Sequence, residues 1–148
     1  MSKLLKLISI SLLGLFLTSG AFAKTEVVYI PKNTGNPYFD SIIKGFEVGA
    51  EKYGYNFSTV APATADATSQ LPFIKAEIQR GVDVIAISPN SNDALNTVFD
   101  QARKKGIIVM VVNGDIPGSE AHRDLAIMPV DFSTVGTAQM TLMGQLID

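Results

Sequence analysis

A group of hydrogen-bonding and aromatic side chains follows the short apolar run at residues 26–30. The loop after residues 26–30 has the sequence PKNTGNPYFD and contains Lys32, Asn33, Asn36, Tyr38 and Phe39. It joins a predicted strand to the start of a predicted helix, where backbone N–H groups converge. The side chains add ammonium and amide groups beside flat aromatic faces. Because a polyhydroxylated ring needs both kinds of surface, this segment predicts one half of a sugar-binding cleft.

Short β-rich runs alternate with amphipathic stretches along the chain. The runs cover residues 26–30, 56–60, 82–87, 107–112 and 125–130, and helical spacing follows most of them. Asn36, followed by Pro37, is predicted to cap the first helix, Ser69 the second, and Ser133 or Thr134 the last. The alternation predicts an α/β fold, a Rossmann-like doubly wound parallel sheet with helices on its faces.

Polar residues recur where the predicted strands end. Ser88 and Asn90 follow the third strand, and Asn113 and Asp115 follow the fourth. Ligands of open parallel sheets bind at the carboxyl ends of the strands, near the point where the strand order reverses. We therefore expect these side chains to converge on one rim with the loop after the first strand.

Three segments resemble periplasmic sugar-binding proteins of ABC importers, the ribose-type or type I family. They are residues 31–39 (PKNTGNPYF), 83–89 (DVIAISP) and 111–115 (VVNGD), in the order and spacing of that family. Lys32 and the pair Asn113 and Asp115 look closest to the rhamnose-type and autoinducer-2-type binders. The resemblance implies a monomeric, non-enzymatic, two-lobed receptor that closes around one sugar and delivers it to a membrane permease. It further implies that this chain is an N-terminal part, truncated before the second lobe.

The resemblance also implies roles for individual residues. Asn36, Tyr38 and Phe39 match the family's Asn-Pro-Phe-Phe motif, whose amide bonds ring hydroxyls and whose aromatics pack against the sugar. Ser88 matches a position often held by Asn. Asn113 stands where ribose-type binders have Asp followed by Arg, and Gly114 follows it here, which argues against ribose and favours Lys32 and Asp115 as charged contacts. The residues alone leave alternatives open: Lys32 as a solvated lysine, Asp115 as a cap of its own turn, and Phe39 as a core residue.

The first 23 residues have the pattern of a secretory signal peptide. Lys3 and Lys6 precede an apolar core at 7–17, and Ala21-Phe22-Ala23 forms a small-x-small cleavage site. We therefore expect a periplasmic protein whose residues 24–148 form an incomplete N-terminal lobe. The chain has no cysteine and a net charge of −2, which excludes a disulfide framework and disfavours nucleic acid as a partner. We expect no cofactor and no metal site, and His122 as a surface residue.

Three other classes of protein compete with a sugar importer component. A dinucleotide enzyme is disfavoured because the turn after the first strand has one glycine, Gly35, and no Gly-x-Gly-x-x-Gly motif. A sugar-responsive repressor needs a helix-turn-helix where this chain has the predicted signal peptide. A sensory component that presents the bound sugar or autoinducer to a chemoreceptor or sensor kinase remains an alternative that the sequence does not discriminate.

Overall fold

The computed structural model describes residues 23–91, 93–114, 118–128 and 132–147. The predicted signal peptide therefore lies almost entirely outside the described residues, and Asp115 lies outside them as well. Within the described part of the chain, no helix has both the length and the apolar character needed to cross a membrane.

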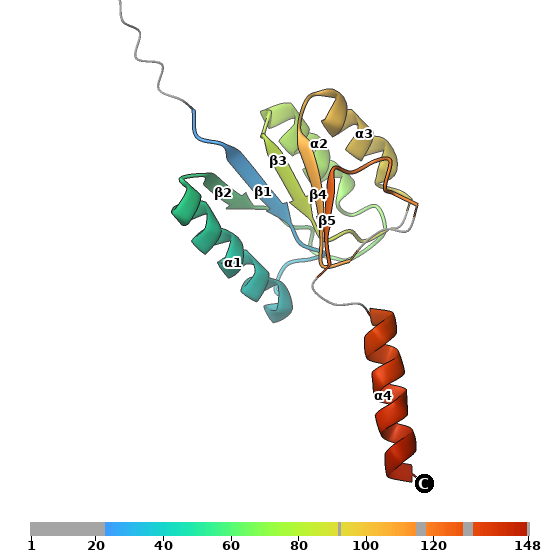
Figure 1. The fold of residues 1–148 in the computed structure, drawn as a ribbon. Helices are drawn as coiled ribbons and strands as arrows, with labels where there is room; N and C mark the ends of the chain where they lie inside the picture. The colour runs from blue at the N-terminus through green and yellow to red at the C-terminus, as the bar shows by residue number, and fades with distance from the viewer. Residues whose placement is uncertain (1–22, 92, 115–117, 129–131, 148) are drawn as a thin grey trace, which may run out of the picture.

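The centre of the molecule is a five-stranded parallel sheet with the order β2-β1-β3-β4-β5 (Figure 1). The strands are β1 (Glu26–Ile30), β2 (Asn56–Thr59), β3 (Val84–Ile87), β4 (Ile108–Val112) and β5 (Leu125–Ile127). In the central register, Ile30 lies opposite Ile87 and Ile87 opposite Val111. The predicted α/β class is confirmed, although the third and fifth strands are shorter than expected.

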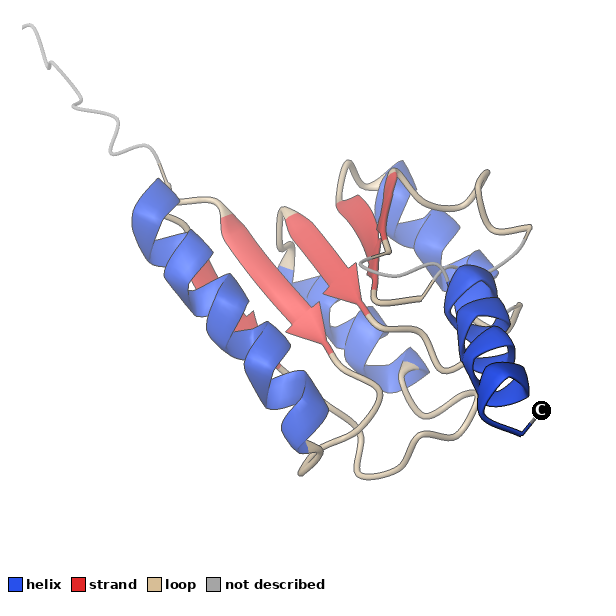
Figure 2. Ribbon diagram, turned by 60° about the horizontal axis from the view of Figure 1, so that its bottom comes forward, coloured by secondary structure: helices blue, strands red, loops and turns tan. Residues whose placement is uncertain are grey.

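The strand order reverses between β1 and β3, because β1 leads to β2 on one side and β3 lies on the other. This arrangement places α1 (Pro37–Tyr53) on one face, and α2 (Leu71–Arg80) and α3 (Asn96–Lys104) on the other (Figure 2). Alternation along β1 separates two cores. Val28 and Ile30 pack with α2 and α3, whereas Tyr29 packs with Phe46 of α1.

Local signals in the sequence fix the ends of α1. The Asn36 side chain accepts a hydrogen bond from the Tyr38 N–H at 3.1 Å, and Pro37 occupies the first turn. Gly54 ends the helix in the left-handed conformation, with φ 72°. The predicted cap of α1 is therefore confirmed.

The predicted caps of the other two helices are wrong. The helix α2 begins at Leu71, so its N-cap is Gln70, whose side chain makes no capping bond. The predicted cap, Ser69, lies one residue earlier, and its hydroxyl donates to the Asp66 carbonyl at 2.7 Å. The last helix, α4 (Phe132–Ile147), begins before both Ser133 and Thr134. Its described side chains, at 133–147, are exposed, and Figure 1 shows the helix apart from the sheet and its other helices.

Candidate functional site

The loops that follow β1, β3 and β4 meet at one rim of the sheet. The Asn90 side chain, in the loop after β3, donates from Nδ2 to the Lys32 carbonyl oxygen at 2.8 Å. The Ser88 hydroxyl, at the end of β3, donates to the Val112 carbonyl oxygen of β4 at 3.0 Å. Parallel strands bring all three carboxyl ends to the same edge, and these bonds tie the loops together there. The predicted convergence of the strand-end loops is therefore observed among the described residues.

Tyr38 and Asn113 link the start of α1 to the end of β4. The Tyr38 hydroxyl donates a hydrogen bond to Oδ1 of Asn113, and 53% of the Tyr38 side chain is exposed. Asn113 is the one non-glycine residue in the described part of the chain with a positive φ, 68°. Its N–H donates to the Ile127 carbonyl at 2.9 Å, which fixes the backbone against β5. Asn tolerates this left-handed conformation better than most residues, and such positions are common at functional sites.

Lys32 contributes a positively charged group to the loop after β1. Its backbone is held by Asn90, but its ammonium group has no ion-pair or hydrogen-bond partner among the described residues. The side chain is half-buried. An unpaired ammonium can donate up to three hydrogen bonds to hydroxyl oxygens of a ligand.

Asn36 combines a structural bond with a free donor. Its Oδ1 caps α1 through the Tyr38 N–H, which leaves the Nδ2 amino group available at the helix start. The hollow next to this loop has a volume of about 220 Å³ and is lined by residues that include Asn33, Gly35, Phe39 and Thr59.

The structure corrects the predicted role of Ser88. Its side chain is 0% exposed, and its hydroxyl bonds the Tyr29 hydroxyl at 2.8 Å as well as the Val112 carbonyl. A serine hydroxyl can donate one hydrogen bond, and that of Ser88 donates to the Val112 carbonyl. The Tyr29 hydroxyl is therefore the donor of the other bond. Burial raises the pKa of Tyr29 to about 12. Ser88 thus joins two strands inside the lobe and presents no group to the rim.

Phe39 also differs from its predicted role as a ring stacked on a sugar. It is 4% exposed and belongs to the apolar core between α1 and the sheet, where it meets Tyr38 edge-on. Its place on the apolar stripe of α1 determines this burial, as one of the two readings of the sequence allowed. Tyr38, which lies off that stripe, is the exposed aromatic residue of the pair.

Gln70 was not among the predicted site residues, yet its side chain links the loops after β1 and β3. Its fully buried side chain donates from Nε2 to the carbonyl oxygens of Pro31 at 3.0 Å and Ser88 at 2.9 Å. Its Oε1 accepts from the Asn90 N–H at 2.9 Å. A glutamine before a helix has no distinctive motif, so only the tertiary structure reveals these contacts.

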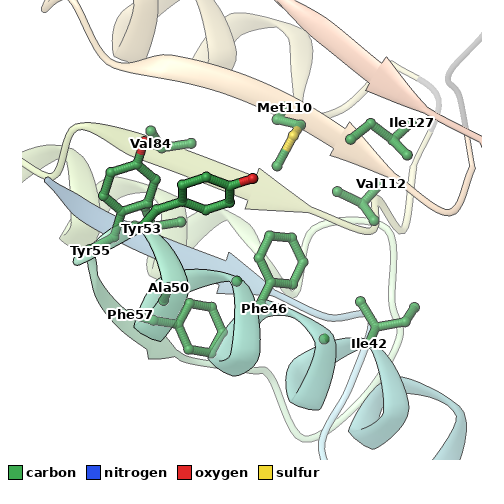
Figure 3. A pocket seen from close by; sticks show the side chains of 13 residues that line it. Ile42, Phe46, Ala50, Tyr53, Tyr55, Phe57, Val84, Met110, Val112 and Ile127 are labelled. Atoms are coloured by element: carbon green, nitrogen blue, oxygen red, sulfur yellow. The ribbon is translucent and has the colours of Figure 1, made fainter.

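An apolar groove lies on the α1 face of the sheet (Figure 3). It has a volume of about 450 Å³, and Ile42 and Phe46 of α1 face Met110 and Val112 of β4 across it. Its lining side chains carry no amide, carboxylate or ammonium group. The groove suits an apolar protein surface better than a sugar. Within the described residues, no group of three or more His, Asp or Glu side chains could hold a metal ion.

The parallel sheet, its order and its polar rim define a ligand-binding lobe of the doubly wound class. Residues 27–148 match the model of the periplasmic binding protein domain, and the chain belongs to this family.

Known relatives are proteins that bind sugars. The D-allose-binding periplasmic protein of Escherichia coli strain K12 is 33% identical over 111 residues, which are 74% of this chain and 36% of that protein. An ABC transporter solute binding protein of Burkholderia graminis, solved with D-arabinose, is 32% identical with a TM-score of 0.78, covering 84% of this chain and 42% of that one. An ABC transporter solute binding protein of Clostridium phytofermentas, solved with L-rhamnose, is 26% identical with a TM-score of 0.75, and the match covers 82% of this chain and 37% of that one. The chain thus spans less than half the length of each of these proteins.

Proposed function

We propose that this protein is a periplasmic substrate-binding protein that captures a sugar or sugar-like molecule for an ABC transporter. The observation that carries the proposal is the rim, where the free ammonium of Lys32 lies in a loop bonded to its neighbours and Tyr38 is exposed beside Asn113. The sugar-binding relatives support the same class of ligand. On this proposal the protein is a receptor without catalytic activity that works with a membrane permease.

The ligand contacts that we propose on this lobe are Lys32, Asn36, Tyr38, Asn113 and Asp115. Lys32 and the Asn36 amino group would donate to ring hydroxyls, and Tyr38 and Asn113 offer a phenol and an amide that already bond each other. A hydrogen bond to a charged group contributes roughly 1.5–3 kcal/mol, about twice a neutral one. Lys32 and Asp115 would therefore dominate specificity in a closed, dry cleft.

Gly114 after Asn113 bears on the identity of the sugar. The Asp-Arg pair of ribose-type binders, to which this position corresponds by resemblance, is absent from the sequence. This difference disfavours ribose, and the relatives with D-allose, D-arabinose and L-rhamnose in their names indicate the first sugars to test.

We propose that residues 24–148 form an incomplete N-terminal lobe. The exposed helix α4 carries apolar side chains such as Met140, Leu142 and Leu146 that pack on no layer of the sheet. Because the family match includes α4, we assign this helix to the lobe, and we assign the apolar groove of Figure 3 to a surface that another element covers. Because all-parallel sheets are normally covered on both faces, an open groove over β4 and β5 supports this assignment.

Isothermal titration calorimetry on the exported product of the complete gene tests the proposed function. The panel includes L-rhamnose, D-allose, D-arabinose, D-ribose, other monosaccharides and autoinducer-2, with amino acids as negative ligands. We expect tight binding of one sugar or of autoinducer-2. Binding of an amino acid instead, or of no member of the panel, would contradict the proposal.

The charged contacts have a separate test. Lys32→Ala combined with Asp115→Ala should weaken binding of the best sugar at least tenfold, because each change removes a charged hydrogen-bonding group. Lys105→Ala, which removes an exposed lysine at the end of α3, is the matched control. An unchanged affinity in the double variant would show that Lys32 and Asp115 are not ligand contacts.

A further inference from the structure

The side-chain amide of Gln70 fills the crevice between the carboxyl ends of β1 and β3, where the strand order reverses. It bonds the carbonyl of the first residue after each strand, Pro31 and Ser88, and the N–H of Asn90. Both Nε2 protons and Oε1 are thus used, and the side chain is 0% exposed. Open α/β sheets bind their ligands above this crevice, so Gln70 lies directly beneath the expected ligand position.

Asn90 extends the same contact to the next carbonyl of the loop. Its Nδ2 donates to the Lys32 carbonyl at 2.8 Å and to the Ser69 hydroxyl at 3.1 Å, whereas its buried Oδ1 has no partner among the described residues. An unpaired buried acceptor is unfavourable, so the position of this amide reflects its role as a donor. Gln70 and Asn90 together hold two consecutive carbonyls, those of Pro31 and Lys32.

We propose that Gln70 and Asn90 are the positioning residues of the sugar site. They fix the position and direction of the loop that carries Lys32 relative to the sheet, and they join this loop to the end of β3. The inference rests on the proposed function, since it assigns Lys32 to the ligand. It also explains why a polar side chain occupies a fully buried place between apolar strands: an aliphatic residue there would leave two carbonyls and one N–H without partners.

The test uses Gln70→Glu, which preserves shape but replaces the Nε2 donor with an acceptor. An ionised carboxylate facing two carbonyl oxygens repels them, whereas the protonated acid can donate to one of them. Burial raises the pKa of such a carboxyl group. We therefore expect sugar affinity at pH 8 to fall at least tenfold, or 1.4 kcal/mol, and to recover in part at pH 5, relative to the wild type at each pH.

Two further variants complete the experiment. Gln79→Glu adds the same charge on the exposed side of α2 and should bind as the wild type does at both values of pH. Asn90→Ala removes the bond to the Lys32 carbonyl without adding charge and should weaken binding at least fivefold, which keeps the test informative if Gln70→Glu does not fold. Wild-type affinity in Asn90→Ala, or in a folded Gln70→Glu at pH 8, would overturn the inference while leaving sugar binding intact.

A measurement without ligand separates this inference from the proposed function. The Thr34 N–H donates to the Pro62 carbonyl at 2.9 Å and reports the order of the loop that contains Lys32. Hydrogen exchange at Thr34 should be at least tenfold faster in Asn90→Ala than in the wild type at the same pH. Equal exchange rates would overturn the positioning role whether or not any sugar binds, whereas failure of the wild type to bind any sugar overturns the proposed function alone.

Discussion

Replacing Ser88 with alanine should destabilise the lobe by about 2–3 kcal/mol, with little change in sugar affinity. The variant loses the bonds to the Tyr29 hydroxyl and to the Val112 carbonyl, 2.8 and 3.0 Å long. Each neutral hydrogen bond contributes about 0.5–1.5 kcal/mol, and a buried group left without a partner costs about 1–3 kcal/mol. Tyr29 and Ser88 are both 0% exposed, so water cannot replace the lost partner.

The reverse change, Tyr29→Phe, should cost only about 1 kcal/mol, because Ser88 keeps its bond to Val112. The double variant should cost less than the sum of the two single ones, since no tyrosine hydroxyl then remains unpaired. Urea unfolding of the protein, followed by circular dichroism, gives the three free energies, and calorimetry gives the sugar affinity.

Two results would refute this reasoning. The first is a Ser88→Ala variant that is no less stable than Tyr29→Phe, which would show that the buried hydroxyl finds another partner. The second is a tenfold loss of sugar affinity in Ser88→Ala with unchanged stability, which would restore Ser88 as a ligand contact.

Two more predictions concern Tyr29 and Asn36. Because the pKa of Tyr29 is raised from 10.0 to about 12 in the folded lobe, the unfolded chain loses this proton first as pH rises. Stability should therefore be full below pH 10 and fall by up to about 2–3 kcal/mol as pH rises from 10 to 12, an effect that Tyr29→Phe lacks; parallel urea titrations at these pH values check it. Asn36→Ala should lower stability by about 1 kcal/mol by removing the cap of α1, whereas Asn36→Asp retains the acceptor and should stay within about 0.5 kcal/mol of the wild type. If Asn36 donates to a sugar, Asn36→Asp should still weaken sugar binding. Thermal unfolding checks the capping role, and equal stability of Asn36→Ala and Asn36→Asp would contradict it.

Much of the fold could be predicted from local sequence patterns. The alternation of apolar runs predicted the parallel sheet and its helices, and the Asn36-Pro37 pair predicted the start of α1. The position of the last helix could not be predicted in the same way. The helical spacing of its apolar residues predicts a helix but not what it packs on, and here these residues remain exposed.

The candidate site was predictable only in part, for a geometric reason. A sequence shows that Ser88 follows a strand but not which way its side chain turns, and here it turns toward Tyr29. The contacts of Gln70 depend on three segments brought together by the sheet. Lys32 and Asn113 lie in rim loops and Tyr38 lies in the first turn of α1, whereas their contacts with a ligand stay a prediction.

The bond between Tyr38 and Asn113 has a consequence for how a ligand competes with the empty protein. A sugar hydroxyl that donates to Oδ1 in place of Tyr38, or accepts the Tyr38 proton in place of Oδ1, replaces a hydrogen bond that already exists. The gain is then the difference between two bonds, far less than the 0.5–1.5 kcal/mol of one. A ligand that separates the pair without offering polar atoms leaves two unsatisfied groups, each costing about 1–3 kcal/mol where water is excluded. On the proposed function, the pair would therefore favour ligands with a hydroxyl at this place over their deoxy analogues.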